Sequence, residues 1–214
     1  MELNSMVKDV KAAVFLSVLA VAGCASHDYP PLPTSAVQIP VTTDPASYNY
    51  RIGPGDQLDI FVWRNPDLST EVQVRPDGKI TTPLVEDISV SGKTPASVAR
   101  ELEQELSKYI RDPIVTILVK GFVGPYSEQV RIVGEASSPQ AIAYREKMTL
   151  LDVMIAVGGL TEFADGDKAT LIRVVDGKHQ QYNIKLEKLI KDGEIAANAD
   201  VLPGDVIIIP EAIF

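Results

Sequence analysis

The fold of this chain is decided by the stretch YRIGPGDQLDIFVW, residues 50–63. It opens with a turn sequence from Gly53 to Asp56, in which proline presets φ, glycine accepts a positive φ and aspartate bonds nearby backbone amides. Leu58, Ile60 and Val62 then occupy every second position, which is typical of a β-strand. We therefore predict that ordered structure begins at residue 50 with a tight turn that leads into a strand.

Further strands and one helix are predicted to complete a first unit over residues 50–120. Val72 and Val74 occupy alternate positions, as in a strand, and Asp77 with Gly78 follows. The Asp77, Gly78 pair predicts a hairpin turn, after which the second strand of the hairpin contains Ile80. Downstream, Thr94 is a suitable N-cap and Pro95 a suitable first helical residue. Apolar residues then recur every fourth position, at Val98, Leu102, Leu106 and Ile110. We expect Asp112 and Pro113 to end this helix, and residues 114–119 to form a buried strand.

Residues 130–210 predict a second mixed unit, which gives the chain an α+β fold. Thr149 and Asp152 form a variant of the capping box at the start of a helix, and Gly158 with Gly159 is expected to end it. Asp176 and Gly177 indicate another hairpin. The expected strands are residues 130–133, 141–144, 171–175, 180–184 and 206–209, with a short helix at 186–190.

One turn sequence occurs twice, because Pro203, Gly204 and Asp205 precede the last strand as residues 54–56 precede the first. Either a β-grasp-like unit is repeated or the same turn chemistry arose independently. Turn and cap roles are expected for Gly53, Pro54, Gly55, Asp56, Asp77, Gly78, Gly158, Gly159, Pro203, Gly204 and Asp205.

The N-terminal residues indicate secretion and an anchor. The apolar run at residues 12–23 is too short for a span of about 20 residues but suits the core of a signal peptide, with Lys8 and Lys11 before it. Cys24, the single cysteine, follows directly and fits lipidation, whereas a buried structural thiol is the alternative. We predict a signal peptide at residues 1–23 and a lipidated, proline-rich tether at residues 24–49.

Composition and motifs argue against nucleic acid and catalysis. The formal net charge of −9 offers no basic surface for phosphates. The two histidines, His27 and His179, stand apart, and the chain has no phosphate-binding glycine loop, nucleophile elbow or cluster of metal ligands. We expect no enzyme activity, no cofactor and no metal.

The aromatic residues Tyr50 and Trp63 have two readings. Their rings could stack on sugar, whereas half-buried aromatic residues of a strand are the commoner case.

The motifs together resemble those of the outer-membrane polysaccharide export family. The residues that carry the resemblance are 50–56, 74–80, Pro83 and 92–95 for a polysaccharide export domain, and 133–135, Pro139, 149–152, 156, 158–161 and 202–205 for a soluble-ligand-binding β-grasp (SLBB) domain. The resemblance implies an export domain over residues 50–120 and an SLBB domain over residues 130–210.

The resemblance also implies a non-enzymatic function. The expected protein is an outer-membrane lipoprotein whose domains, in the periplasm, form a homo-oligomeric ring through which capsule or exopolysaccharide passes. An inner-membrane polysaccharide co-polymerase would deliver the polymer. Only four residues follow Pro210, too few for a membrane-spanning helix, so a separate outer-membrane β-barrel is expected as partner. The alternative is a monomeric lipoprotein that binds cell-wall or secreted glycan without transport.

Overall fold

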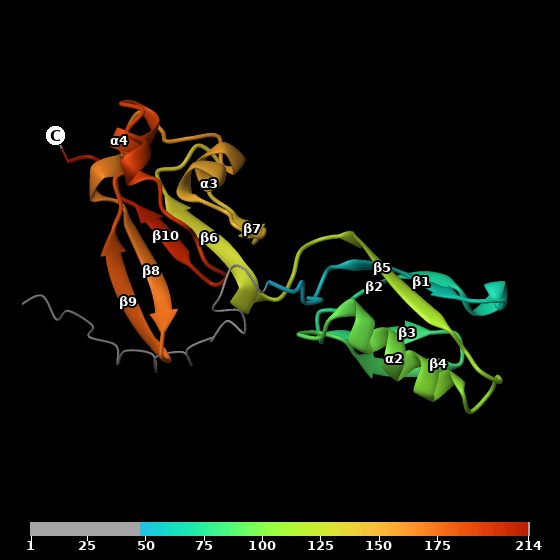
Figure 1. Cartoon of the computed structure of the whole chain (residues 1–214). Coiled ribbons are helices and arrows are strands. Elements are labelled where there is room, and N and C mark those ends of the chain that lie inside the picture. The colour runs from blue at the N-terminus through green and yellow to red at the C-terminus, as the bar shows by residue number, and fades with distance from the viewer. Residues whose placement is uncertain (1–47, 214) are drawn as a thin grey trace, which may run out of the picture. The chain divides into compact units, whose positions relative to one another are not determined.

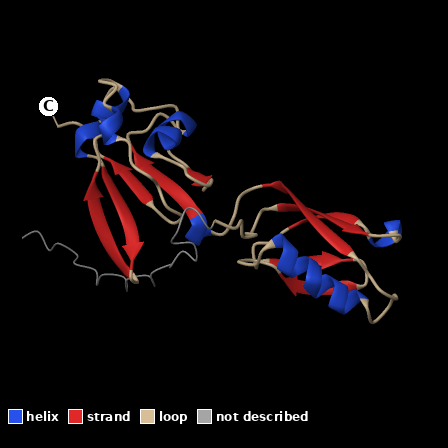
Figure 2. Cartoon of the chain, viewed as in Figure 1, coloured by secondary structure: helices blue, strands red, loops and turns tan. Residues whose placement is uncertain are grey.

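A computed structural model describes residues 48–213 (Figure 1). The signal peptide, Cys24 and nearly all of the tether predicted from the sequence lie outside the described residues. The described chain forms two regions, each with its own hydrophobic core and its own sheets (Figure 2). Helices and strands are mixed in both regions, so the predicted α+β fold is confirmed.

The first region holds five strands and one α-helix. Its elements are β1 (Gln57–Val62), η2 (Pro66–Leu68), β2 (Thr70–Gln73), β3 (Lys79–Thr82), β4 (Val85–Ser89), α2 (Pro95–Leu106) and β5 (Val115–Gly121). β1 lies between β2 and β5 in an antiparallel sheet, and β3 pairs with β4 in a separate hairpin. The helix α2 packs on β5 and β4.

The helix α2 begins where the sequence predicts. The Thr94 hydroxyl accepts a hydrogen bond from the Ser97 amide at 3.3 Å, and Pro95 is the first helical residue. Leu102 and Leu106 are buried in the core of the first region. The helix ends at Leu106 rather than near Asp112, because the amides of Lys108 and Tyr109 bond carbonyls three residues back and the chain passes into turns.

Two sequence predictions for this region are wrong. Asp77 and Gly78 do form a tight turn, but β2 and β3 belong to different sheets, and β3 pairs with the unpredicted strand β4. The strand β5 is buried on one face only, since Leu118 is 52% exposed. It is an edge strand, and its outward face has no element packed against it in the first region.

The second region is a five-stranded sheet with two short helices. Its elements are η3 (Tyr126–Glu128), β6 (Gln129–Gly134), β7 (Ala141–Ala143), α3 (Leu150–Ala156), η4 (Gly166–Lys168), β8 (Thr170–Val175), β9 (Lys178–Asn183), α4 (Leu186–Ile190), η5 (Ile195–Ala197) and β10 (Val206–Ile209). The strand order is β7, β6, β10, β8, β9. Only β6 and β10 run parallel, and the other neighbours are antiparallel.

The predicted capping box starts α3. Asp152 accepts hydrogen bonds from the Thr149 amide at 2.9 Å and the Thr149 hydroxyl at 2.7 Å, and these bonds lower the pKa of Asp152. The helix ends at Ala156, and both Gly158 (φ 77°) and Gly159 (φ 86°) then adopt left-handed conformations. The hairpin at Asp176 and Gly177 also forms as predicted, between β8 and β9.

Candidate functional sites: two buried carboxylates and an aromatic sheet face

The side chain of Asp56 is a hydrogen-bonding centre with no solvent exposure. Its Oδ2 accepts from the Tyr50 hydroxyl at 2.6 Å and from the Gly53 amide at 2.9 Å. Its Oδ1 accepts from the amides of Val123 at 2.7 Å and Gly124 at 3.0 Å. One carboxylate therefore ties the turn before β1 to the segment after β5, and we call this arrangement the Asp56 clamp.

The clamp explains why glycine stands at two positions of the opening turn. A Cβ on Gly53 would lie 2.0 Å from the carbonyl carbon of Gly124, so the two backbones touch where any side chain would collide. Gly55 has a φ of +93°, which only glycine adopts without strain. In the stretch that decides the fold, a close contact between two backbone segments is thus stabilised by the buried carboxylate of Asp56.

Tyr50 is part of the clamp. Its hydroxyl is used by Asp56, and its ring meets Phe122 edge-on at 5.2 Å between ring centroids. Burial and the bond to Asp56 raise the pKa of Tyr50 above its usual value. These contacts weaken the reading of Tyr50 as a glycan contact.

Asp205 lies in a similar turn in the second region, and its side chain is also fully buried. Its Oδ2 accepts from the Leu202 amide at 2.8 Å, and both oxygens accept from the Arg173 guanidinium at 3.0 and 2.7 Å. Gly204 has a φ of +83°. The Arg173 guanidinium neutralises the Asp205 carboxylate, whereas the Tyr50 hydroxyl and three backbone amides stabilise the carboxylate of the Asp56 clamp.

The two turns differ in what surrounds them. In both, the aspartate oxygen bonds the amide three residues earlier, and a strand follows. However, β1 has two antiparallel neighbours, whereas β10 is parallel to β6. The shared feature is therefore the local turn, and the structure gives no repeat of the whole unit.

An exposed aromatic face lies on the β2, β1, β5 sheet. Phe61 and Trp63 are 45% and 53% exposed, and their rings meet edge-on at 6.3 Å between centroids. Trp63 directly follows the last residue of β1, so it lies just outside the strand, and its ring contacts that of Phe61. The sequence analysis missed Phe61, although its alternation with buried Ile60 and Val62 could have indicated it.

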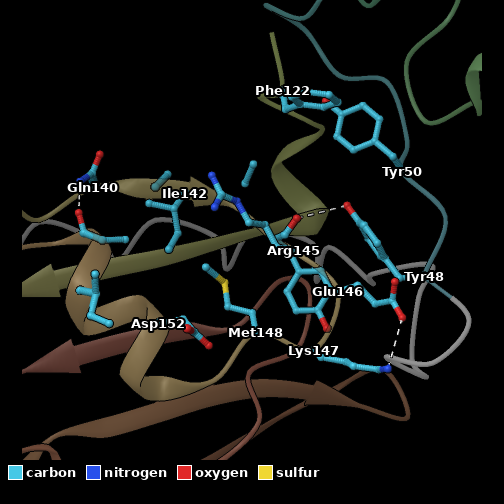
Figure 3. A pocket seen from close by; sticks show the side chains of 15 residues that line it. Tyr48, Tyr50, Phe122, Gln140, Ile142, Arg145, Glu146, Lys147, Met148 and Asp152 are labelled. Carbon is cyan, nitrogen blue, oxygen red and sulfur yellow. Dashed lines mark hydrogen bonds and ion pairs between the residues drawn. The ribbon is translucent and has the colours of Figure 1, made fainter. Parts of the chain in front are cut away.

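A groove of about 1230 Å³ is lined mainly by residues 140–148, which include β7, and by residues of α3 (Figure 3). Tyr48, at the end of the predicted tether, packs edge-on against Tyr144 at 5.0 Å between centroids. Glu146 and Lys147 pair at the rim at 3.9 Å, and Asp152 is engaged in the cap of α3. The groove is therefore lined by apolar and charged side chains together, and the carboxylates of Glu146 and Asp152 already have partners.

Neither a metal-binding cluster nor a membrane-spanning helix is present among residues 48–213. Within this range, no three histidine, cysteine or carboxylate side chains are grouped so that they could hold a metal ion. No helix in the same range has the length and apolarity needed to cross a membrane.

The two folded regions match known domains. Residues 44–120 match the family described as polysaccharide biosynthesis/export protein, and residues 129–195 match the SLBB domain. This chain holds a polysaccharide export domain and an SLBB domain. The resemblance stated from the sequence motifs is thereby confirmed.

Curated proteins related to this chain share modest sequence identity with it. The EPS I polysaccharide export outer membrane protein EpsA of Ralstonia nicotianae is 28% identical over 182 residues, covering 74% of this chain and 46% of the relative. The capsule polysaccharide export protein BexD of Haemophilus influenzae is 25% identical, covering 75% and 43%. The exopolysaccharide production protein ExoF of Rhizobium meliloti is 27% identical, covering 56% and 30%. The chain thus spans less than half the length of these relatives.

Proposed function

We propose that this export protein is a lipid-anchored subunit of the conduit that carries capsule or exopolysaccharide out of a Gram-negative cell. The observation that supports this most directly is the presence of an export domain and an SLBB domain in one chain. Relatives named for polysaccharide export align with most of its length. In this proposal the domains occupy about residues 50–120 and 130–210, and both lie in the periplasm.

The proposed anchor is Cys24, acylated after removal of residues 1–23. Several acyl chains hold a protein stably on a membrane, whereas one chain holds it only marginally. In cells fed labelled palmitate, wild-type protein should take up the label and Cys24→Ser should not. Label in the Cys24→Ser chain would refute this part of the proposal.

The proposed assembly is a closed homo-oligomeric ring around the polymer. In a closed ring, each subunit buries matching surfaces against its neighbours and no binding surface is left free. The ring would also enclose a hydrated passage for the polymer. An inner-membrane co-polymerase would pass the polymer into this ring. Electron microscopy of the detergent-extracted protein should show rings. Particles of the size of one subunit would instead favour a monomeric glycan-binding lipoprotein.

The proposed activity is transport without bond chemistry. The fully buried carboxylates of Asp56 and Asp205 are both engaged by backbone amides and by Tyr50 or Arg173, so neither is free to move a proton to a substrate. Polymer movement requires a passage and a supply of chain, and neither requires catalysis by this subunit.

The deciding experiment is genetic. Deletion of the gene should abolish polysaccharide outside the cell while polymer accumulates inside, and the wild-type gene should restore export. Normal amounts of extracellular polysaccharide in the deletion strain would overturn the proposed function.

A further inference from the structure

The outward face of β1 presents an ordered series of side chains. Gln57, Asp59, Phe61 and Trp63 occupy alternate positions, and the residues between them are buried. Alternate positions on a strand are about 7 Å apart, so the four side chains extend over roughly 20 Å. An amide and a carboxylate stand at one end of this series and two aromatic rings at the other. We call it the β1 track.

The aromatic end of the track is open to a ligand. The Phe61 and Trp63 rings lie at 68° to each other, and such an edge-on pair leaves broad ring faces uncovered. The indole N–H of Trp63 has no hydrogen-bond acceptor among residues 48–213. Ile114, whose carbonyl oxygen accepts from the Trp63 amide at 2.9 Å, is 56% exposed and widens the apolar surface.

The polar end of the track offers several hydrogen-bonding groups. Glu71 on β2 lies directly opposite Asp59, and Lys120 from β5 pairs with both carboxylates, at 3.3 Å from Asp59. All three side chains remain partly exposed. Two carboxylates and an ammonium group can therefore accept from and donate to hydroxyl groups without losing a buried partner.

We propose that the β1 track binds the polysaccharide in an extended form, with sugar rings stacked on Phe61 and Trp63 and sugar hydroxyls bonded to Asp59, Glu71 and Gln57. A pyranose has an apolar C–H face and a rim of hydroxyls, which matches aromatic rings beside exposed polar groups. The core of a protein interface is instead depleted of charged residues, so the mixed character of the track favours glycan over a second copy. This inference rests on the proposed function, which supplies the polymer.

The chain carries its own reporter for this test, because Trp63 is its single tryptophan. The full-length protein would be titrated with short fragments of the polysaccharide made by its source strain, prepared by partial hydrolysis. We expect a saturable change in indole fluorescence. Calorimetry should show binding about tenfold weaker for Phe61→Ala and for Trp63→Ala, as for the loss of one stacked ring.

The matched control is Tyr109→Ala, which removes another exposed aromatic ring, 59% exposed and beyond α2. It should bind the fragments as the wild type does, and circular dichroism should show that all three variants are folded. Three results would overturn the inference: no saturable response, wild-type affinity in Phe61→Ala and Trp63→Ala, or fluorescence that depends on protein concentration but not on sugar. The last result would identify the face as a contact between copies.

The failure of this inference can be told from the failure of the proposed function. If gene deletion blocks export but Phe61→Ala and Trp63→Ala bind the fragments normally, only the β1 track is refuted. If the deletion strain exports normally, the proposed function itself is refuted.

Discussion

A single carboxylate can decide the path of a chain when its bonds reach residues far apart in sequence. Asp56 bonds Tyr50 and Gly53 on one side and the amides of Val123 and Gly124 on the other. Hydrogen bonds to a buried charge stabilise more than neutral ones, and an unpaired buried group is costly. The clamp is therefore expected to contribute strongly to the stability of the first region.

We predict that Asp56→Asn lowers the free energy of unfolding by on the order of 3 kcal/mol, because an amide presents an N–H group to neighbours that are all donors. Urea unfolding measures this value. The matched control, Asp67→Asn, changes an exposed carboxylate in η2 and should leave the urea midpoint nearly unchanged. Equal effects of the two substitutions would contradict the clamp.

We predict that the protein loses stability at alkaline pH, because the Tyr50 hydroxyl can donate to Asp56 only while it is protonated. Its pKa lies above the usual 10 in the folded protein, so the stabilisation is complete below pH 10 and is lost as the pH rises further. Tyr50→Phe should be less stable by about 1 kcal/mol at neutral pH and should lose less stability on alkalisation than the wild type. Burial raises the pKa of Tyr48 to about 12, so some alkaline dependence should remain.

Urea unfolding at a series of pH values tests this prediction. Identical alkaline dependence in Tyr50→Phe and the wild type would show that the Tyr50 hydroxyl does not donate to Asp56 in solution.

At the scale of elements, local chemistry determines where helices begin and end. The α3 helix has a reciprocal cap between Thr149 and Asp152 at its start and two left-handed glycines after its end. A Cβ on Gly159 would meet no atom within 4 Å. Backbone conformation alone therefore requires glycine there, and packing does not.

We predict that Gly159→Ala costs about 1 kcal/mol of stability and that Gly159→Asn costs less, since asparagine tolerates the left-handed conformation. Thermal or urea unfolding gives both values. Loss of export in Gly159→Ala, with stability and protein abundance unchanged, would indicate instead that this glycine contacts sugar.

The sequence predicts elements of this kind better than it predicts their partners. Thr94 and Pro95 define the start of α2, and Asp176 with Gly177 defines the β8, β9 hairpin, because these signals lie within a few residues. The pairing of β3 with β4 and the Asp56 clamp were missed, since each depends on contacts that no local pattern encodes. The outward face of β5 was missed because a run of apolar residues suits a buried strand as well as an edge strand.

At the scale of the whole chain, the two regions have separate hydrophobic cores, each with one buried aspartate turn. Asp205 forms a buried pair with Arg173. Removal of one partner of such a pair leaves an uncompensated charge and costs roughly 3 kcal/mol or more.

We therefore predict two separable unfolding transitions by calorimetry. Asp56→Asn should lower one transition temperature and Asp205→Asn the other, and the double variant should show both shifts, as expected for independent sites. If both substitutions lower one common transition, the regions unfold as a single cooperative unit.

The parallel pairing of β6 with β10 has a consequence for the order of folding. The first region can fold once residues 123 and 124 have emerged into the compartment where the protein folds, because its core and its clamp need no later part of the chain. The second sheet cannot close at that time, since β10 is made last yet lies between the β6, β7 hairpin and the β8, β9 hairpin. Until β10 emerges, the two hairpins remain unpaired and the core of the second region stays exposed. During this interval a chaperone or a protease has access to the protein.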